Sequence, residues 1–530
     1  MSASQAPTDA PRRSWPTAIA SGGIAGAVYL WTMYPGLVGI GDTPKLQFVG
    51  SVLGTPHSPG YPLYIVLSWV FAQIPIGTLA YRINLFSVVC GALAAGLLAL
   101  VLRELGCRPL IAIAGALAIS FGSLYWSQSI LAEVYALNAL LFSAVLLYLV
   151  RWSRTRANRD LYFAIAYFGL GLAHHLTLAM TAPALFVFAL AADRRVVTPR
   201  VVLFTLLACA VGLSCYGFIW LRTSESASFL EARAQSVHDL VNIVSGKQFH
   251  RALFDFTLPE LIRSRVPLVA GWIGAELRWP GLLLVVVALA GIWRGGRAQV
   301  GLLLGAAAIV IFFALNFNVF DVQVFLLIPM IALGLIAAMG LEVVARRVDR
   351  LGAPASVAIA ALLLPAAQYR ANIHQNDQRR HNFEMTYFDA LFDRLPARTA
   401  FVAESYPINN MVLYKLIGER RARERRVELI KADAETIQQY LDNAFTVFAF
   451  SEARASLEFD GVQFEPVDLG LPAPHSWRHV ADTEAPELAL GLCVATERRD
   501  DSGRADDAPV PPEPFTGALW RPPARGPRSP

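Results

Sequence analysis

The run Leu302-Leu-Leu-Gly-Ala-Ala-Ala-Ile-Val-Ile-Phe-Phe-Ala-Leu-Asn-Phe317 decides the fold class of this 530-residue chain. It contains no charged residue. A helix needs about 20 predominantly apolar residues to cross the hydrocarbon of a bilayer. This run with its flanks meets that need, and Gly281–Trp293 with its flanks is a second run of the same kind. The sequence therefore predicts several membrane-spanning helices.

The composition of the whole chain agrees with this prediction. Hydrophobic residues make up 55% of the chain and charged residues 16%, whereas soluble proteins carry about 25% charged residues. The net charge of +5 comes from arginines in short loops, where membrane topology explains them, so no nucleic-acid partner is indicated. The five cysteines form no CxxC pair, so neither a zinc site nor a disulfide framework is indicated.

Working outward from the two quoted runs, we expect about eleven membrane-spanning helices, connected mostly by short loops. Their expected positions are 16–35, 83–102, 109–126, 134–150, 160–173, 177–192, 201–221, 279–293, 300–317, 323–342 and 353–368. We interpret the first as a span that is retained, because no small-residue cleavage site precedes Pro35. Residues 1–15 then form a cytoplasmic tail.

The arginines fix the expected orientation. Short cytoplasmic loops carry an excess of Lys and Arg. In this chain the short loops near 127–133, 173–176 and 317–322 hold none. The N-terminal tail and the intervening loops are therefore expected on the cytoplasmic side, and the loops without Lys or Arg on the outer side. The cytoplasmic set holds Arg12, Arg13, Arg103, Arg108, Arg151, Arg154, Arg156, Arg159, Arg194, Arg195, Arg200, Arg294, Arg297, Arg346, Arg347 and Arg350.

One apolar segment is left out of that count. Tyr61–Ile76 is short and begins among prolines. If it crossed the membrane, every later arginine loop would lie outside. We therefore expect an interfacial or re-entrant helix, within a first outer loop at 36–82. A second large outer loop is expected at 222–278.

The chain becomes charged and mixed after Tyr369. Residues 369–497 are predicted to form a small α/β domain on the outer side, with strands at Ala400–Ala403 and Thr446–Phe450 and a helix at Ala434–Asn443. Residues 498–530, rich in Pro, Gly, Asp and Arg, are predicted to be a disordered tail. The expected fold class is thus an all-α polytopic membrane bundle with an extracytoplasmic α/β domain.

Ionisable groups at a membrane are costly and need a reason. In the predicted topology several of them fall on the outer face: Asp42, His57, Glu133, the pair His174–His175, and Asp321. The cytoplasmic loops contain little besides arginine. An active site that faces outward is the economical interpretation.

Each of these residues also has a purely structural interpretation. Asp42 and Asp321 fit helix caps, and Glu133 fits a first-turn acid favoured by the helix dipole. The histidine pair fits satisfied interfacial side chains, and the nearby Tyr and Trp residues fit an aromatic belt. The functional interpretation gains weight because all of these features share one face.

Five stretches of the chain match known motifs: Gly41-Asp-Thr43, His57-Ser-Pro-Gly-Tyr-Pro-Leu-Tyr64, Trp126-Ser-Gln128, Glu133-Val-Tyr-Ala-Leu-Asn138 and His175-Leu-Thr177. They resemble the multi-pass family called domain of unknown function 2723, whose eukaryotic relatives look like protein O-mannosyltransferases. The resemblance covers about residues 20–345. The layout also resembles the GT-C glycosyltransferase superfamily, which implies a GT-C-like bundle.

The resemblance implies a role for each site residue. Asp42 would be the general base that takes the proton of the acceptor hydroxyl, and Glu133 would assist it or position the acceptor. The family pattern Gly-Asp-Ser-Gly-Glu reads Gly41-Asp-Thr-Pro-Lys45 here, so a metal site with two neighbouring acids is not indicated, and no cofactor is expected. Groups expected to hold the lipid phosphate or the substrate are Lys45, His57, Tyr61, His175, Asp321, Arg82 and Arg222.

The function implied by the resemblance is that of an inverting glycosyltransferase in the inner membrane of a bacterium. It would transfer a sugar, with mannose the first candidate, from a polyprenyl-phosphate donor to a hydroxyl on a protein, lipid or glycan acceptor. Two alternatives stay open. A transporter or flippase of a lipid-linked glycan would show internal repeats and midplane sites, and a receptor or scaffold that binds cell-wall material would leave the membrane-face acids unexplained.

Overall fold

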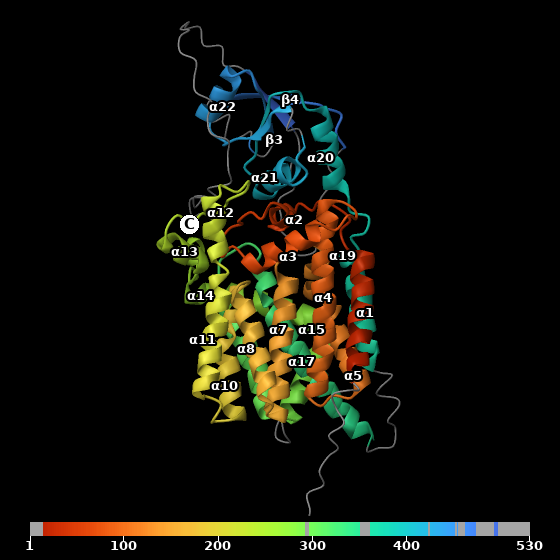
Figure 1. Ribbon diagram of the computed structural model, residues 1–530. Coiled ribbons are helices and arrows are strands. Elements are labelled where there is room, and N and C mark those ends of the chain that lie inside the picture. The colour runs from red at the N-terminus through yellow and green to blue at the C-terminus, as the bar shows by residue number, and fades with distance from the viewer. Residues whose placement is uncertain are drawn as a thin grey trace, which may run out of the picture.

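A bundle of apolar helices carries a mixed helix and sheet domain at one of its ends (Figure 1). The computed structural model describes residues 14–291, 296–349, 361–421, 425–450, 453, 462–472 and 492–496. The predicted tail at 498–530, most of residues 1–15 and the first part of the expected span at 353–368 lie outside the described residues.

The helices follow the predicted apolar runs closely. The first half of the bundle contains α1 (Trp15–Thr32), α2 (Thr43–Val49), α3 (Pro62–Ala72), α4 (Leu79–Glu104), α5 (Pro109–Ser120), α6 (Ser123–Ser129), α7 (Tyr135–Thr155) and α8 (Asn158–Leu172). The second half contains α9 (Leu176–Met180), α10 (Ala182–Ala192), α11 (Pro199–Ser214), α12 (Gly217–Ser224), α13 (Val237–Val244), α14 (Leu258–Glu260), α15 (Val266–Gly291), α16 (Arg297–Leu315), α17 (Leu327–Asp349) and α19 (Leu363–Asn376).

Several of these helices are long and apolar enough to cross a membrane. Within the described residues there are six of them, or up to seven if the bent pair α5 and α6 forms one span. The segments at 16–35, 160–173 and 177–192 also contain helices, but these lie outside that set of six or seven. The chain is therefore a membrane protein with several spans, and the number eleven stays a prediction.

The helix α3 occupies the segment that the charge rule kept out of the membrane. Its 11 residues give a length of about 16 Å at 1.5 Å per residue, which is shorter than the hydrocarbon thickness of about 30 Å. It lies at the end of the bundle that carries the C-terminal domain (Figure 1). This length and place fit an interfacial helix.

Helix α15 contains a break just before the expected span at 279–293. The helix starts at Val266 and is interrupted at Arg278, where φ is 55° and ψ is 171°. The sequence prediction began just after this break because Glu276 and Arg278 interrupt the apolar run. The segment after the break therefore coincides with the expected span, and the outer loop at 222–278 stays a prediction.

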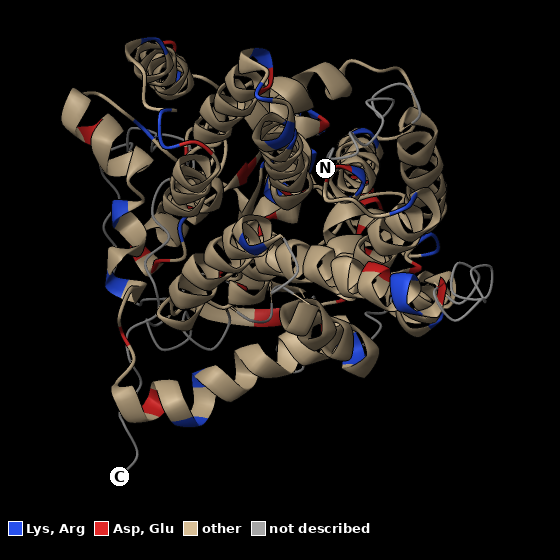
Figure 2. Ribbon diagram, turned by 90° about the horizontal axis from the view of Figure 1, so that it is seen from below, with Lys and Arg blue, Asp and Glu red and all other residues tan. Residues whose placement is uncertain are grey.

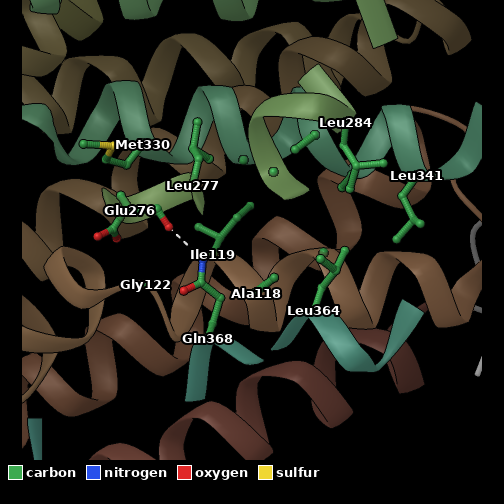
Figure 3. A pocket seen from close by; sticks show the side chains of 15 residues that line it. Ala118, Ile119, Gly122, Glu276, Leu277, Leu284, Met330, Leu341, Leu364 and Gln368 are labelled. Carbon is green, nitrogen blue, oxygen red and sulfur yellow. Dashed lines mark hydrogen bonds between the residues drawn. The ribbon is translucent and has the colours of Figure 1, made fainter. Parts of the chain in front are cut away.

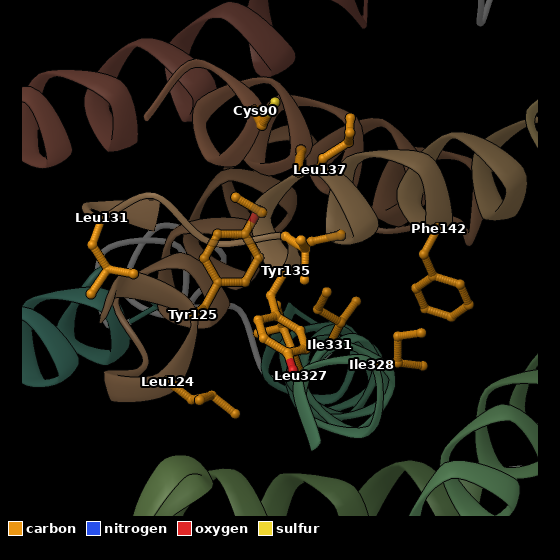
Figure 4. Packing of buried hydrophobic residues seen from close by; sticks show 14 of the residues in the cluster. Cys90, Leu124, Tyr125, Leu131, Tyr135, Leu137, Phe142, Leu327, Ile328 and Ile331 are labelled. Atoms are coloured by element: carbon orange, nitrogen blue, oxygen red, sulfur yellow. The ribbon is translucent and has the colours of Figure 1, made fainter. Parts of the chain in front are cut away.

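The core of the bundle is built from large apolar side chains on helices far apart in sequence. Tyr135 and Phe142 on α7 pack beside Leu327, Ile328 and Ile331 of α17 (Figure 4). These side chains are nearly inaccessible to solvent. Burying an apolar side chain of this size stabilises a fold by about 1.5–3 kcal/mol in water, and inside the membrane the same contacts fix the helix packing.

The loops rich in arginine meet at the opposite end of the bundle. Arg151 and Arg154 contact Glu104 at 2.8 and 2.9 Å, and Arg108 contacts Glu342 at 3.3 Å and Asp349 at 2.7 Å. Figure 2 views the molecule from this end and shows Lys and Arg on several helix ends. A cavity of about 570 Å³ also lies here, lined by Arg156, Arg195 and Arg200 among others. The helix contacts thus bring the predicted arginine loops to one side.

The C-terminal domain contains a five-stranded sheet. Its strands are β1 (Thr399–Val402), β2 (Val427–Leu429), β3 (Thr446–Phe450), β4 (Gln463–Val467) and β5 (Leu492–Thr496), in the order β2-β1-β3-β5-β4. Strands β2, β1 and β3 are parallel, and β5 pairs antiparallel with β3 and β4. The helices of this part are α20 (Phe383–Arg394), α21 (Tyr406–Leu413), the π-helix η6 (Tyr414–Gly418) and α22 (Ala434–Asp442).

The domain is docked directly on the helix α2 and its neighbours. The hydroxyl of Tyr414 accepts a hydrogen bond from the backbone N–H of Ala80 at 3.0 Å, and Glu384 accepts one from Gly39 at 3.1 Å. Gly418 lies so close to Phe48 that a Cβ at this position would be 2.7 Å from the Phe48 Cβ. The sheet domain therefore covers the end of the bundle where the predicted site residues lie.

Candidate functional site

Asp42 lies at the start of α2 and faces a cluster of ionisable groups. It is the N-cap residue of this helix, yet its side chain makes no capping hydrogen bond. Its Oδ1 instead lies 3.0 Å from Lys45 Nζ, one turn along α2, and its Oδ2 lies 3.5 Å from His57 Nε2. The side chain keeps 28% of its surface exposed. The purely structural interpretation of Asp42 as a helix cap is therefore not supported.

Lys45 is the centre of this cluster. Its side chain is fully buried, and its ammonium lies 3.0 Å from Asp42 and 3.0 Å from Glu231. It also contacts His57 Nδ1 and the hydroxyl of Tyr406. A buried ammonium requires such partners, because an unpaired buried charge costs several kcal/mol. Lys45 is thus surrounded by four protein groups, and its expected contact with a lipid phosphate stays a prediction.

His57 connects Asp42 with the helix α3. Because its Nδ1 contacts the Lys45 ammonium, which only donates, the ring carries its proton at Nε2. That Nε2 lies 3.3 Å from the hydroxyl of Tyr61 and 3.5 Å from Asp42 Oδ2. His57 therefore presents a hydrogen-bond donor to any anion that enters beside Asp42.

Glu133 reaches the same region from the loop between α6 and α7. Its Oε1 accepts a hydrogen bond from Thr43 Oγ1 at 3.0 Å, and Thr43 is the residue after Asp42. Helix α7 begins at Tyr135 and has no acidic residue in its first turn, so the first-turn interpretation of Glu133 is not supported. The carboxyl of Glu133 is thus held by the residue that follows Asp42.

The histidine pair divides into two roles. His174 hydrogen-bonds the carbonyl of Val134 at 2.8 Å and is fully buried. His175 caps α9 by accepting from the backbone N–H of Thr177, and its ring stacks on Tyr61 with the centroids 5.8 Å apart. Tyr61 therefore links His175 to His57, while the capping bond gives His175 a structural role as well.

The remaining predicted residues lie at the margin of the cluster. Asp321 is at the N-cap position of the short helix η5 (Val322–Leu326) without a side-chain capping bond, and its charge acts on Tyr61 and Glu133. Arg82 donates to the carbonyls of Ala72 and Ile74 at 2.7 and 3.0 Å, and Arg222 donates to the carbonyl of Leu53 at 2.8 Å. Both arginines thus bind backbone carbonyls of neighbouring loops and helix ends.

Two members of the cluster were missed by the sequence analysis. Glu231, in the predicted second outer loop, contacts Lys45 and accepts a hydrogen bond from the backbone N–H of His57 at 3.1 Å. Tyr406, the first residue of α21, places its hydroxyl 3.0 Å from Asp42 Oδ1 and 3.3 Å from Glu231 Oε1. A glutamate in a mixed-charge loop and a tyrosine in a soluble domain carry no signal in the sequence.

The surroundings of Asp42 and Glu133 shift the pKa values of these two carboxyls in opposite directions. Burial by itself would raise the pKa of Asp42, but the neighbouring His57 and Lys45 outweigh it and hold that pKa below its usual value. Burial, with the charge of Asp42 added, raises the pKa of Glu133 well above its usual value. Burial lowers the pKa of His57. Asp42 is therefore ionised at neutral pH, whereas Glu133 favours the protonated form.

Asp42 and Glu231 share the ammonium of Lys45, which occupies the place that a metal ion would take between two carboxylates. Within the part of the chain that the structure describes, no three His, Cys, Asp or Glu side chains are arranged to hold a metal ion. A separate cavity of about 60 Å³ lies between α5, α15, α17 and α19, lined by Ile119, Gly122, Glu276, Leu284 and others (Figure 3). None of the predicted site residues lines it.

Comparison with solved structures defines the class of the fold. The crystal structure of ArnT from Cupriavidus metallidurans bound to undecaprenyl phosphate matches with a TM-score of 0.59 and 12% sequence identity. The match covers 90% of this chain and 97% of that chain. The chain is therefore a membrane protein with the GT-C fold, as the resemblance implied.

Comparison of sequences points to a particular group of relatives. A family model described as the N-terminal domain of protein O-mannosyl-transferase TMEM260 matches residues 42–198. The protein O-mannosyl-transferase TMEM260 of Mus musculus is 37% identical over 149 residues, and that of Dictyostelium discoideum is 32% identical over 128 residues. These stretches are 28% and 24% of this chain.

The matched stretch is a small part of those relatives, 21% of the mouse protein and 15% of the Dictyostelium protein. Residues 42–198 nevertheless include Asp42, Lys45, His57, Glu133 and His175. The expected likeness to protein O-mannosyltransferases is thus confirmed for the stretch that holds most of the cluster. The label domain of unknown function 2723 stays an expectation.

Proposed function

We propose that this chain is a membrane glycosyltransferase. It transfers a sugar, with mannose the first candidate, from a polyprenyl-phosphate donor to a hydroxyl acceptor at the end of the bundle covered by the C-terminal domain. The observation that carries the proposal is the partly exposed Asp42 carboxylate, held by Lys45 beside His57 at the start of the stretch that resembles O-mannosyl-transferases. The membrane would be the inner membrane of a bacterium, with the covered end outside.

In the proposed reaction Asp42 accepts the proton of the acceptor hydroxyl. The hydroxyl oxygen forms a bond to the anomeric carbon, and the bond from that carbon to the phosphate oxygen breaks. The lipid phosphate leaves as an anion, so no general acid is required, and attack opposite the leaving group inverts the anomeric centre. The proton remains on Asp42 until the product leaves.

The other groups of the cluster take supporting roles in this proposal. His57, with its proton at Nε2, donates to the departing phosphate beside Tyr61, and His175 holds Tyr61 by stacking. Lys45 fixes the carboxylate of Asp42 and keeps it ionised. Glu133, hydrogen-bonded to Thr43, positions the acceptor, and Asp321 lies at the border of the same site.

The test is a transfer assay with the purified chain in liposomes, using a radiolabelled polyprenyl-phosphate sugar and a hydroxyl acceptor. Asp42→Asn keeps the size of the side chain and removes its basicity, so transfer should fall by about 100- to 10,000-fold. Asp393→Asn is the matched control, because Asp393 is 68% exposed on the C-terminal domain, where its carboxylate pairs with Arg421 at 2.8 Å. Its activity should equal that of the wild type.

Two results would contradict the proposal. A fully active Asp42→Asn variant would remove the base assignment. A wild-type protein that moves the lipid-linked sugar across the liposome membrane, without any transfer, would identify a flippase. Deleting the gene and analysing the glycans on proteins, lipids and cell wall would then identify the acceptor.

A further inference from the structure

Tyr406 brings a hydroxyl from the C-terminal domain to the carboxylate of Asp42. The phenol oxygen lies 3.0 Å from Asp42 Oδ1, contacts Lys45 Nζ, and lies 3.3 Å from Glu231 Oε1. Since the ammonium only donates, the phenol accepts from Lys45 and donates its own proton to a carboxylate. Asp42 and Tyr406 are 364 positions apart in the sequence, so this contact is a property of the folded chain.

This arrangement has the geometry that a general base requires from its substrate. A base must lie within about 2.6–3.2 Å of the oxygen from which it takes a proton, and the phenol oxygen satisfies that condition. Lys45 and Tyr406 both approach Oδ1 of Asp42. An acceptor hydroxyl that approaches the same oxygen must first take the place of the phenol.

We propose that the Tyr406 hydroxyl occupies the acceptor-hydroxyl subsite in the unliganded protein, and that the acceptor displaces it. This inference rests on the proposed function. The subsite then consists of Asp42 as proton acceptor, Lys45 as a donor to the hydroxyl oxygen, and Glu231 as a second acceptor. It fits an alcohol whose neighbouring groups extend between the second outer loop and the C-terminal domain.

The docking of the domain leaves Tyr406 free to withdraw. Tyr406 is only partly buried and Glu404, two residues before it, is exposed, whereas the domain is anchored elsewhere through Tyr414 and Glu384. In the proposal the side chain rotates away while the domain stays in place. With the phenol in the subsite, water is kept from the base, which protects the donor from hydrolysis in the absence of acceptor.

The first experiment compares Tyr406→Phe with the wild type and with Tyr414→Phe. Tyr414 lies at the same domain interface and bonds Ala80, so it controls for loss of a phenol outside the subsite. Loss of one charge-assisted hydrogen bond should change competition for the subsite by about tenfold. Tyr406→Phe should therefore raise acceptor-independent hydrolysis of the donor and lower the KM for acceptor by about that factor, with the KM for donor unchanged. The Tyr414→Phe variant should show neither effect.

A positioning role for Tyr406 gives a different result. If the phenol merely holds Asp42 in place, Tyr406→Phe lowers kcat, leaves the acceptor KM alone and does not raise hydrolysis, and the proposal is overturned.

The second experiment measures access to position 42 without any catalysis. Asp42→Cys is labelled with 2-hydroxyethyl methanethiosulfonate, alone and with Tyr406→Ala, after subtraction of the labelling of the native cysteines. The double variant should react about tenfold faster, while Asp393→Cys with the same alanine should be unchanged. Equal rates at position 42 overturn the proposal even if the transferase is active. A wild type without transfer or hydrolysis overturns the proposed function, while the labelling still decides whether Tyr406 covers Asp42.

Discussion

The two ends of the helix bundle hold their charges in different ways. At the end under the C-terminal domain, the fully buried Lys45 is enclosed by Asp42, Glu231, His57 and Tyr406. At the other end, arginines such as Arg195 and Arg347 are exposed, and Figure 2 shows Lys and Arg on several helix ends. The first arrangement costs desolvation energy and needs a chemical reason, whereas membrane topology is sufficient to explain the second.

The largest expected effect concerns the sides of the membrane on which the two ends lie. Glu435→Cys on α22 and Arg195→Cys at the arginine end are both exposed positions. An impermeant thiol reagent added to intact cells should label the first and leave the second unlabelled until the cytoplasm is opened. Labelling of both positions from the same side would break the comparison and the orientation together.

Removing the buried ammonium of Lys45 should lower the free energy of unfolding more than removing an exposed guanidinium. Lys45→Met leaves Asp42 and Glu231 facing each other without their ammonium, and breaking a buried pair in this way costs about 3–5 kcal/mol. Arg347→Met at the other end should change stability by less than about 0.5 kcal/mol. Thermal unfolding in detergent measures both, and equal midpoints would show that the cluster is not coupled to folding.

Replacing Glu133 should have a smaller effect on transfer than replacing Asp42. Because the pKa of Glu133 is raised by burial, the neutral amide of Glu133→Gln resembles the protonated acid and keeps an oxygen for Thr43. We expect a loss of transfer below about tenfold, as for one neutral hydrogen bond. A loss as large as that of Asp42→Asn in the same assay would instead make Glu133 the base.

The smallest effect is expected from pH. The folded pKa of Asp42 lies below its unfolded value of about 3.9, so its contribution to stability is present above that value and is lost only as the pH falls through the folded pKa. His57, whose pKa is lowered by burial, stays neutral near pH 7. Transfer should therefore vary by less than about twofold between pH 7 and pH 6. A steep fall in kcat/KM across this window would contradict an ionised Asp42 held by Lys45.

Much of the bundle could be predicted because a membrane leaves few choices. Apolar runs such as 302–317 must be helices in lipid, and α16 (Arg297–Leu315) lies where that run indicated. The helix α3 was recognised because the arginine loops excluded it as a span. The extent of the helical segment before the break at Arg278 was not predicted, because Glu276 is satisfied by the backbone N–H of Leu124 at 3.1 Å, a contact between distant segments that no local pattern reveals.

The candidate site also contains residues that could be predicted from the sequence and residues that could not. Asp42, His57, Glu133 and His175 stand out because polar residues beside apolar runs are rare, and the structure joins them through Thr43 and Tyr61. No local pattern predicts Lys45 between two carboxylates, since Glu231 and Tyr406 come from distant segments of the chain. Their placement depends on the docking of the C-terminal domain, which only the folded chain defines.

The position of Tyr406 outside residues 42–198 suggests a way to re-engineer the chain. Asp42, Lys45, His57 and Glu133 all belong to that matched stretch, whereas Tyr406, which contacts Asp42 and Lys45, belongs to a domain more than 200 positions away. In the proposal, residues 42–198 then determine how the donor is bound, and the C-terminal domain determines which acceptor is used. A chimera that exchanges residues after 369 would keep the first and alter the second, so that one bundle could serve several acceptors.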